Sequence, residues 1–403
     1  MSSTSVRLAA IAAIAAAVSV FPACGGGGGG GSPSTQAALG SGATLPAGVA
    51  LTERANTLAE PWGMAFLPDG RLLVTERVGR MQLLDAGGQV QGEVSGVPPV
   101  LHLGQGGLLD VALDPAFATN GRIYFSFAEA DAGDPSINGT AVGRAVLDAN
   151  ARTLSQVAVI WRQQPKVASG IHFGSRLVFD RSGHLFVTLG ERDNPRTAAQ
   201  DLTRGNGKVM RITTDGAPAP GNPAWTMPGA QPEIWTLGHR NVQGAALHPQ
   251  TGELWISEHG AQGGDEVNRL RPGLNFGWPL VSRSQEYETT TPVGPVSQAG
   301  FEDPAWFWEK IDGSTWTGGA KSSIAPAGAA FYTGTAVPEW TGSLFVGALA
   351  GQALWRLTLD GNTVTSQQRL LANLGERIRD VEMGPDGALY LLTDSGRLLR
   401  AGR

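Results

Sequence analysis

Two neighbouring segments of the chain carry side chains suited to acid–base chemistry. His172 lies just before an apolar segment, in SGIHFGSRLVF, and has no place in the apolar pattern of that segment. A histidine that is neutral near pH 7 is a suitable general base. Glu191 ends the next apolar segment, HLFVTLGE, so hairpin pairing would bring its carboxylate to the imidazole. A hydrogen-bonded structural histidine is the alternative interpretation.

Arg377 and Arg379 lie two residues apart in ERIRD, at the start of an apolar segment. Side chains at positions i and i+2 of a strand project from the same face. The two guanidinium groups therefore repel each other unless an anion lies between or in front of them. The alternative is a surface pair that Glu376 and Asp380 neutralise.

Two further segments combine polar groups at short spacing. GHRN places the cation of Arg240 beside the amide of Asn241 in a turn, where the arginine could instead pair with a carboxylate. EHGAQGGDE holds three carboxylates and several glycine carbonyls within nine residues, from Glu258 to Glu266. Oxygen donors at this spacing suit Ca²⁺, although the alternation of a D-x-D-x-D-G loop is absent, so backbone ligands are expected.

Composition and motif searches exclude several other classes of protein. The formal net charge of −5 gives no basic surface for nucleic acid. The glycines of GQGG and GNGK do not lead from a strand into a helix, so dinucleotide and P-loop binding are not predicted. The sequence also lacks zinc-ligand spacing and a G-x-S-x-G elbow.

The N-terminal residues are typical of an export signal. An apolar run follows Arg7 and ends in FPAC, with the single cysteine of the chain, Cys24. This pattern predicts a lipoprotein-type signal peptide over residues 1–24, with cleavage and no lipid as the alternative. Residues 25–50 are rich in glycine and serine and predict a flexible tether. We therefore expect an exported protein that is periplasmic or attached to the outer membrane only by a lipid.

Residues 51–403 repeat one unit six times. Each copy is an apolar segment, a turn rich in Gly, Asp or Pro, and a second apolar segment, which is the signature of a hairpin. The copies begin at Gly63, Asp110, Arg176, Gly244, Gly328 and Asp380. Repeated hairpins of this size predict an all-β chain folded as a six-bladed β-propeller. The first hairpin could instead pair with C-terminal sequence to close the ring.

Eight stretches resemble the soluble glucose/sorbosone dehydrogenase family, in order from about residue 58 to 400. They are PWGMAFLPDGRLLVTER, GQGGLLDVALDP, RLVFDRSGHLFVTLGERDN, PEIWTLGHRNVQGAALHP, EHGAQGGDEVN, NFGWP, SSIAPAG and RIRDVEMGPDGALYLLTD. The family fold is a six-bladed propeller, in agreement with the repeat count. The bacterial branch of the family contains aldose sugar dehydrogenases that use pyrroloquinoline quinone (PQQ) and Ca²⁺.

The resemblance implies roles for individual residues. His172 would take the proton from the C1 hydroxyl of an aldose while hydride passes to PQQ, with Glu191 as the partner of the base. Gln105 would contact the substrate or the quinone, and the carbonyls of Gly260 and Ala261 would hold Ca²⁺. Cofactor contacts are implied for Arg240, Asn241, Ser323, Arg377 and Arg379. Glu266 and the carbonyl of Phe276 match a second, structural Ca²⁺ site.

The chain departs from the family at several positions. Ala350 stands where a lysine near PQQ is common, which implies either weaker cofactor binding or replacement by Lys321 or another cation. Glu191 stands where aspartate is usual, and Phe173 follows the base where a polar residue is usual. Two alternatives remain open, a Ca²⁺-dependent lactonase-like hydrolase and a binding propeller that has lost PQQ. An exported enzyme would pass electrons to a quinone or a small cytochrome.

Overall fold

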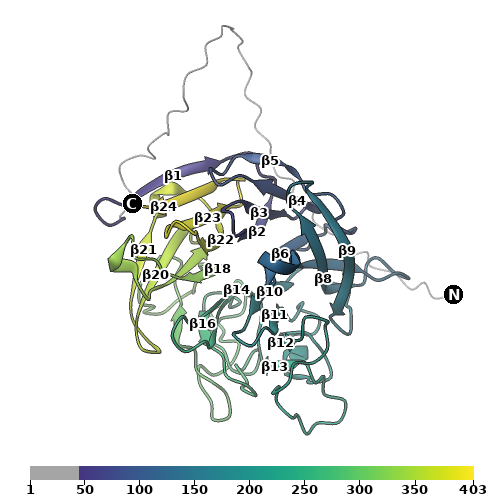
Figure 1. Ribbon diagram of the computed structural model, residues 1–403. Coiled ribbons are helices and arrows are strands. Elements are labelled where there is room, and N and C mark those ends of the chain that lie inside the picture. The colour runs from purple at the N-terminus through teal and green to yellow at the C-terminus, as the bar shows by residue number, and fades with distance from the viewer. Residues whose placement is uncertain (1–44) are drawn as a thin grey trace, which may run out of the picture. The chain divides into compact units, whose positions relative to one another are not determined.

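The computed structural model describes residues 45–403, in which 24 strands form six four-stranded antiparallel sheets (Figure 1). The sheets follow one another around a central axis as blades, so the prediction of a six-bladed β-propeller is confirmed. The signal peptide, Cys24 and the tether as far as residue 44 lie outside the described residues. Within the part described, no helix has the length and apolar character needed to cross a membrane.

Five blades are each built from four consecutive strands, with the innermost strand first. The first blade has β2 (Pro61–Phe66), β3 (Leu72–Glu76), β4 (Arg80–Leu84) and β5 (Val90–Glu93). The second has β6 (Leu108–Leu113), β7 (Arg122–Ala130), β8 (Asn138–Asp148) and β9 (Thr153–Arg162). The third has β10 (Gly174–Phe179), β11 (Leu185–Leu189), β12 (Lys208–Ile212) and β13 (Ile234–Leu237).

The fourth blade has β14 (Val242–Leu247), β15 (Leu254–Glu258), β16 (Asp265–Arg269) and β17 (Trp306–Trp308). The fifth has β18 (Pro326–Phe331), β19 (Leu344–Ala348), β20 (Ala353–Asp360) and β21 (Thr363–Leu370). The sixth has β22 (Ile378–Met383), β23 (Leu389–Thr393) and β24 (Leu398–Gly402). The described helices are single turns between strands: α1 (Phe117–Asn120), η1 (Arg196–Gln200), η2 (Pro338–Trp340) and η3 (Ala372–Leu374).

The sixth blade takes its outermost strand from the start of the propeller. β1 (Ala50–Ala55) pairs antiparallel with β24, with Leu51 opposite Ala401. The first hairpin instead completes the first blade, so the alternative that it closes the ring is wrong. The segment that closes the ring is residues 50–55, just before that hairpin.

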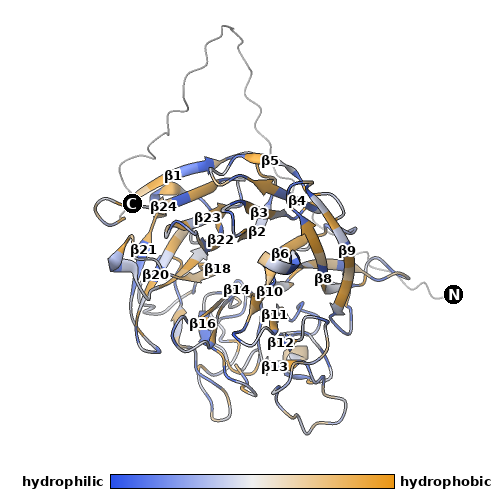
Figure 2. Cartoon of the chain, in the orientation of Figure 1, coloured by the Kyte–Doolittle hydropathy of each residue, from blue (hydrophilic) through white to orange (hydrophobic). Residues whose placement is uncertain are grey.

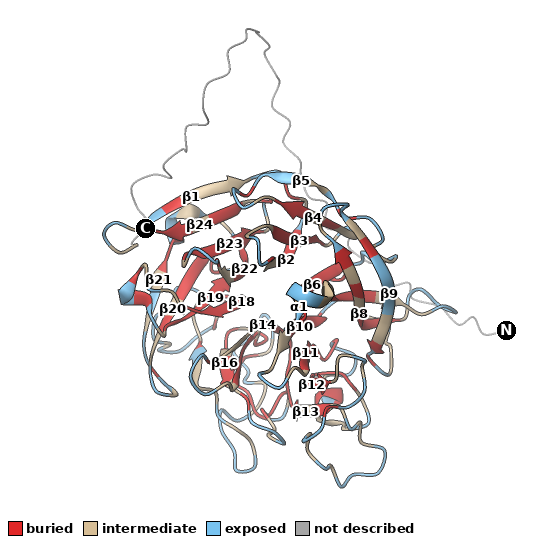
Figure 3. Cartoon of the chain, in the orientation of Figure 1, coloured by how far each residue is buried: buried red, intermediate tan, exposed pale blue. Residues whose placement is uncertain are grey.

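Apolar side chains pack between neighbouring blades. In the second strand of most blades all residues are buried, as in β11 and β23, because both faces of the strand meet a neighbouring blade (Figure 3). The innermost and middle strands are largely apolar, whereas the connecting loops are largely polar (Figure 2). One cluster joins Leu73 of the first blade to Val111 and Ile123 of the second.

The first residues of the six sequence copies form a ring around the axis. Arg176 makes ion pairs with Asp110 at 3.1 Å and with Asp380 at 2.8 Å, although these residues come from three blades. The copies that begin with glycine leave room for these side chains. A Cβ atom on Gly328, for example, would lie 2.2 Å from a carboxylate oxygen of Asp380. The ion pairs therefore fill the channel just below its mouth.

Each innermost strand has an irregular register near its N-terminal end. The pairing shifts between Gly174 and Leu177 of β10 and between Ile378 and Asp380 of β22, and the other four blades show the same feature. A β-bulge bends its strand and re-aims the neighbouring side chains. The bulges therefore lie beside the channel mouth, where the candidate residues gather.

Candidate active site at the channel mouth

The candidate residues lie at equivalent ends of the blades. Six of them come just before an innermost strand: Gln105, His172, Arg240, Asn241, Ser323 and Arg377. Arg379 is the second residue of β22. Glu191, Gly260 and Ala261 come just after a second strand. The innermost strands contact one another in a closed ring, so these ends meet at one mouth of the channel. Sequence position and fold thus agree on the location of the site.

His172 and Glu191 form a buried pair. Nδ1 of His172 lies 2.8 Å from Oε2 of Glu191, and because a carboxylate accepts, Nδ1 donates. No hydrogen bond to Nε2 of His172 is found within the described residues, so its lone pair is free to accept a proton. The other carboxylate oxygen, Oε1 of Glu191, is buried without a partner. The longer side chain of glutamate therefore still reaches the imidazole.

Gln105 contacts the candidate base through its amide. Oε1 of Gln105 accepts a hydrogen bond from the backbone N–H of His172 at 2.8 Å. This contact fixes the orientation of the amide, because the oxygen must face the N–H group. The Nε2 group of Gln105, on an exposed side chain, is left to donate to a ligand at the mouth.

Arg240 and Asn241 present buried donors without partners. The Nε atom of Arg240 and the Nδ2 atom of Asn241 have no hydrogen-bond partner in the described part of the chain. Arg240 donates from Nη2 to the hydroxyl of Tyr287 at 2.8 Å, and its guanidinium lies 5.2 Å from the ring centre of Trp278. Since buried donors are normally satisfied, these two fit the oxygen atoms of a bound ligand.

Arg377 and Arg379 share one carboxylate. Nε of Arg377 lies 2.8 Å from Oδ2 of Asp394, and Nε of Arg379 lies 2.9 Å from Oδ1. The neutralising partner is therefore Asp394, and the alternative that named Glu376 and Asp380 is wrong. Although burial acts in the opposite direction, the two arginines lower the pKa of Asp394. Two cations against one anion leave a net positive charge at the mouth.

Asp265 fixes the loop that carries the expected metal-binding carbonyls. Its carboxylate accepts from the backbone N–H of Gly260 at 2.9 Å and from the hydroxyl of Ser323 at 2.8 Å. Burial raises the pKa of Asp265 to about 6 against these hydrogen bonds. The carbonyl oxygens of Gly260 and Ala261 accept no hydrogen bond from the described residues, so both are available to a cation. Ser323 acts on this loop through Asp265.

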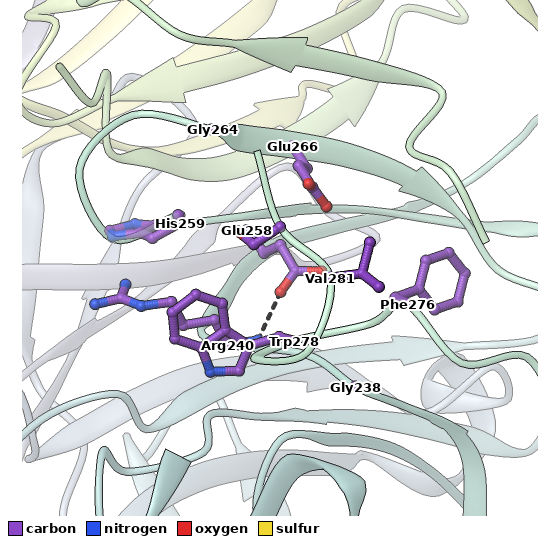
Figure 4. A pocket seen from close by; sticks show the side chains of 11 residues that line it. Gly238, Arg240, Glu258, His259, Gly264, Glu266, Phe276, Trp278 and Val281 are labelled. Carbon is purple, nitrogen blue, oxygen red and sulfur yellow. Dashed lines mark hydrogen bonds between the residues drawn. The ribbon is translucent and has the colours of Figure 1, made fainter. Parts of the chain in front are cut away.

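A second pair of carboxylates lines a cavity behind this loop (Figure 4). Glu258 accepts from Nδ1 of His239 at 2.9 Å and from the backbone N–H of Arg240 at 2.8 Å. Glu266, in contrast, accepts a single side-chain hydrogen bond from the described residues, at 3.3 Å from Asn268. Burial and the nearby charge of Glu258 raise the pKa of Glu266 to about 8. A cation beside Glu266 would relieve both effects.

The backbone carbonyl of Phe276 is a further oxygen donor in this cavity. Phe276 lines the cavity with Glu266, and its carbonyl oxygen accepts no hydrogen bond within the described residues. In that same part of the chain, no three His, Cys, Asp or Glu side chains are grouped as a metal site. A Ca²⁺ bound here would therefore need backbone oxygen in addition to the carboxylate of Glu266.

Sequence reasoning missed two groups at the mouth, Tyr287 and Asp394. Tyr287, which contacts Arg240, lies in the insertion between the fourth and fifth repeats, where no pattern places individual residues. Asp394 directly follows β23, and hairpin pairing with β22 was the one signal that could have found it. Lys321, which the sequence offered as a replacement for the lysine missing at Ala350, donates to Glu309 and to the carbonyl of Arg283.

Comparison with known proteins assigns the family. The family model described as glucose/sorbosone dehydrogenase matches residues 58–400. The chain belongs to the glucose/sorbosone dehydrogenase family. It is 42% identical over 361 residues to the aldose sugar dehydrogenase YliI of Escherichia coli, covering 88% of this chain and 93% of that protein. The expectation of a sugar oxidoreductase of this family is therefore confirmed.

Solved structures of the family share the propeller. A crystal structure of a glucose dehydrogenase is 44% identical, with a TM-score of 0.81 over 88% of this chain and 99% of that chain. An aldose sugar dehydrogenase of Streptomyces coelicolor, solved in its PQQ-bound form, is 31% identical, with a TM-score of 0.69 over 89% and 99%. The expectation of PQQ as cofactor agrees with that structure, and the hydrolase alternative loses its basis.

Proposed function

We propose that the chain oxidises aldose sugars at C1 to the lactone, with PQQ and Ca²⁺ as cofactors. The observation that carries this proposal is the placement of the His172–Glu191 pair at the same mouth as Arg240, Arg377 and Arg379. PQQ has three carboxylates, which arginine binds well, and the unpartnered donors of Arg240 and Asn241 fit its oxygen atoms. When bound, PQQ supplies the quinone that takes the hydride from C1.

The residues of the chain would then have separate roles in the reaction. Nε2 of His172 accepts the proton of the C1 hydroxyl, while Glu191 holds the ring in the required tautomer and stabilises the imidazolium. Nε2 of Gln105 donates to the sugar or the quinone edge. Arg240 stabilises the negative charge that develops on the quinone oxygen. The carbonyls of Gly260 and Ala261 would hold a Ca²⁺ that acts as a Lewis acid. The carboxylate of Glu266 and the carbonyl of Phe276 would hold a structural Ca²⁺.

Reconstitution tests this function. The protein without cofactor is loaded with Ca²⁺ and PQQ, and reduction of a redox dye is followed with glucose, xylose and other aldoses. We expect dye reduction that depends on sugar, on PQQ and on Ca²⁺. If PQQ does not bind at micromolar concentration and no dye is reduced, the chain is instead a binding propeller without cofactor.

Replacing Arg377 by alanine is expected to weaken PQQ binding by about 1.5–3 kcal/mol, the range for a hydrogen bond to a charged group. Arg377 is the cleaner target of the pair, because Arg379 also supports Gln243 within the channel. Titration calorimetry of PQQ into the Ca²⁺-loaded protein measures the change. Arg271→Ala, which removes an exposed arginine paired with Glu302, is the control. Equal affinity in all three proteins would place Arg377 outside the cofactor site.

Glu266→Gln is expected to reduce the stabilisation of the fold by Ca²⁺. A ligand at a hundredfold excess over its Kd stabilises a folded protein by about 2.7 kcal/mol, and the neutral amide removes the charge that attracts the ion. Without Ca²⁺ the variant should be more stable than the natural chain above about pH 8, where the carboxylate of Glu266 would otherwise be charged beside Glu258. Thermal unfolding with and without Ca²⁺ measures both effects, with Glu302→Gln as a surface control. The same Ca²⁺ shift in Glu266→Gln would contradict the assignment.

We further propose that the protein is exported and is either periplasmic or anchored to the outer membrane through Cys24. The apolar run before Cys24 and the glycine tether support this proposal. An enzyme in that location would pass its electrons to a quinone or a small cytochrome.

A further inference from the structure

Arg192, the residue after Glu191, is fully buried next to the candidate base. None of the hydrogen bonds that it makes within the described residues goes to a carboxylate. Its acceptors are instead carbonyl-type oxygens. A buried guanidinium without an ion pair is costly, so its retention requires an explanation other than charge neutralisation.

The guanidinium joins two segments of different blades. Nε donates to the backbone carbonyl of Ile171 at 2.8 Å, and Nη2 donates to the carbonyl of Ser169. Nη2 also donates to the side-chain oxygen of Asn138 in β8 at 2.6 Å. The contact runs both ways, since the Ser169 hydroxyl donates to the carbonyl of Arg192 at 2.7 Å. Arg192 therefore ties the segment 169–173 to the second blade.

The flat face of the same group covers Phe173. The guanidinium carbon lies 3.7 Å from the centre of the Phe173 ring, which is itself buried. Phe173, the residue after the base, thus presents an aromatic face to the guanidinium. Arg192 thus contacts the residues on both sides of His172, and it does so without touching the imidazole.

The backbone that these contacts hold is strained. His172, Arg192 and Asp193 have φ values of 52°, 70° and 51°, in the left-handed region that costs a residue with a side chain roughly 1–2 kcal/mol. The carbonyl of His172 also lies against Gly190, where a Cβ atom would approach to 1.9 Å. Such a conformation persists only where the surroundings determine it.

Lysine cannot make the same set of contacts. A guanidinium presents five donors in a rigid planar fork, whereas an ammonium is a single point on a flexible stem. Burial lowers the pKa of Arg192 to about 9, against the effect of the Glu191 charge. The side chain is therefore still cationic at neutral pH.

We propose that Arg192 is a positioning residue, which holds the segment 169–173 in the shape that presents the His172 ring to Glu191 and to the channel mouth. The proposal rests on the proposed function, in which His172 is the base. Arg192 itself does not contact the sugar or the cofactor.

Arg192→Lys tests the proposal. We expect kcat with the dye to fall about a hundredfold, the effect of a displacement of about 1 Å at a reacting group. KM for the sugar and the affinity for PQQ should stay close to those of the natural chain, because their arginines are untouched. Asn138→Ala, which removes one acceptor and keeps the arginine, should show a smaller loss of kcat in the same direction.

The matched control is Arg181→Lys. Arg181 also donates to two backbone carbonyls, those of Gln250 and Pro249, but in the turn at the other end of the β10–β11 hairpin. It should keep full activity. A natural kcat in folded Arg192→Lys would overturn the proposal, as would a loss of kcat matched by the loss of PQQ affinity.

A spectroscopic measurement separates this proposal from the proposed function. The chain has six histidines, so ¹⁵N-histidine labelling and His172→Asn identify the His172 ring signals in the protein without cofactor. We expect Arg192→Lys to shift the Nδ1 signal, because the contact with Glu191 is disturbed. If the natural chain oxidises no aldose, the proposed function fails, and an unchanged Nδ1 signal would still refute the role of Arg192 by itself.

Discussion

His172→Asn is expected to lower kcat by a factor of about 10² to 10⁴, the usual contribution of a general base, while PQQ remains bound. Asparagine is the suitable replacement, because residue 172 has a φ of 52° and asparagine adopts the left-handed region more readily than most residues. The turn should therefore survive the loss of the imidazole. Stopped-flow measurement of cofactor reduction by sugar, with PQQ affinity from calorimetry, gives the two quantities.

The control for this variant lies in the same blade. His184 is paired with Asp180 and Arg211 in the turn of the β10–β11 hairpin, at the end away from the mouth. His184→Asn should leave kcat unchanged. A His172→Asn protein that binds PQQ and oxidises sugar at the natural rate would remove His172 from the reaction.

Arg176→Met is expected to destabilise the fold by about 3–5 kcal/mol, the cost of leaving buried charges without their partner. Asp110 and Asp380 lose their shared cation, and the hydrogen bonds of Arg176 to the carbonyls of Gln243 and Arg379 are lost as well. Arg144→Met, which breaks a surface pair with Asp215, should cost less than about 1 kcal/mol. Urea unfolding of both variants provides the comparison.

The loss should depend on pH in a defined direction. Burial already raises the pKa of Asp380 to about 6, and the charge of Arg176 opposes that rise. Without Arg176 the pKa rises further, and a raised pKa in the folded state gives stability that is lost as the pH increases through it. The loss of unfolding free energy in Arg176→Met should therefore be smaller at pH 5 than at pH 8. A deficit of equal size at both pH values would contradict the ion-pair explanation.

Much of the fold follows from short-range patterns. The turn between two apolar segments recurs six times, and a hairpin is determined by residues within about 15 positions of one another. The candidate residues could be placed because they recur at one point of that unit, just before its first strand or just after its second. His172 and Glu191 meet because they occupy these two points in a single hairpin.

Contacts between different repeats could not be predicted from the sequence. Nothing near Arg176 indicates that its partners are Asp110 and Asp380, since three blades must close before the side chains meet. Tyr287 reaches Arg240 from an insertion without periodicity. The bulges at the start of the innermost strands depend on pairing geometry, and the role of Ser323 depends on Asp265 in another blade. Each of these features can be identified only when the blades are assembled into the ring.

The pairing of β1 with β24 also determines when the fold can be completed during synthesis. Thr52 and Arg400, which are hydrogen-bonded in the finished sheet, are separated by 348 positions. If synthesis proceeds at roughly 5–20 residues per second, β24 is synthesised about 20–70 seconds after β1. During that interval β1 is an unpaired strand in the nascent chain, and the ring of blades can close only after the last residues are synthesised.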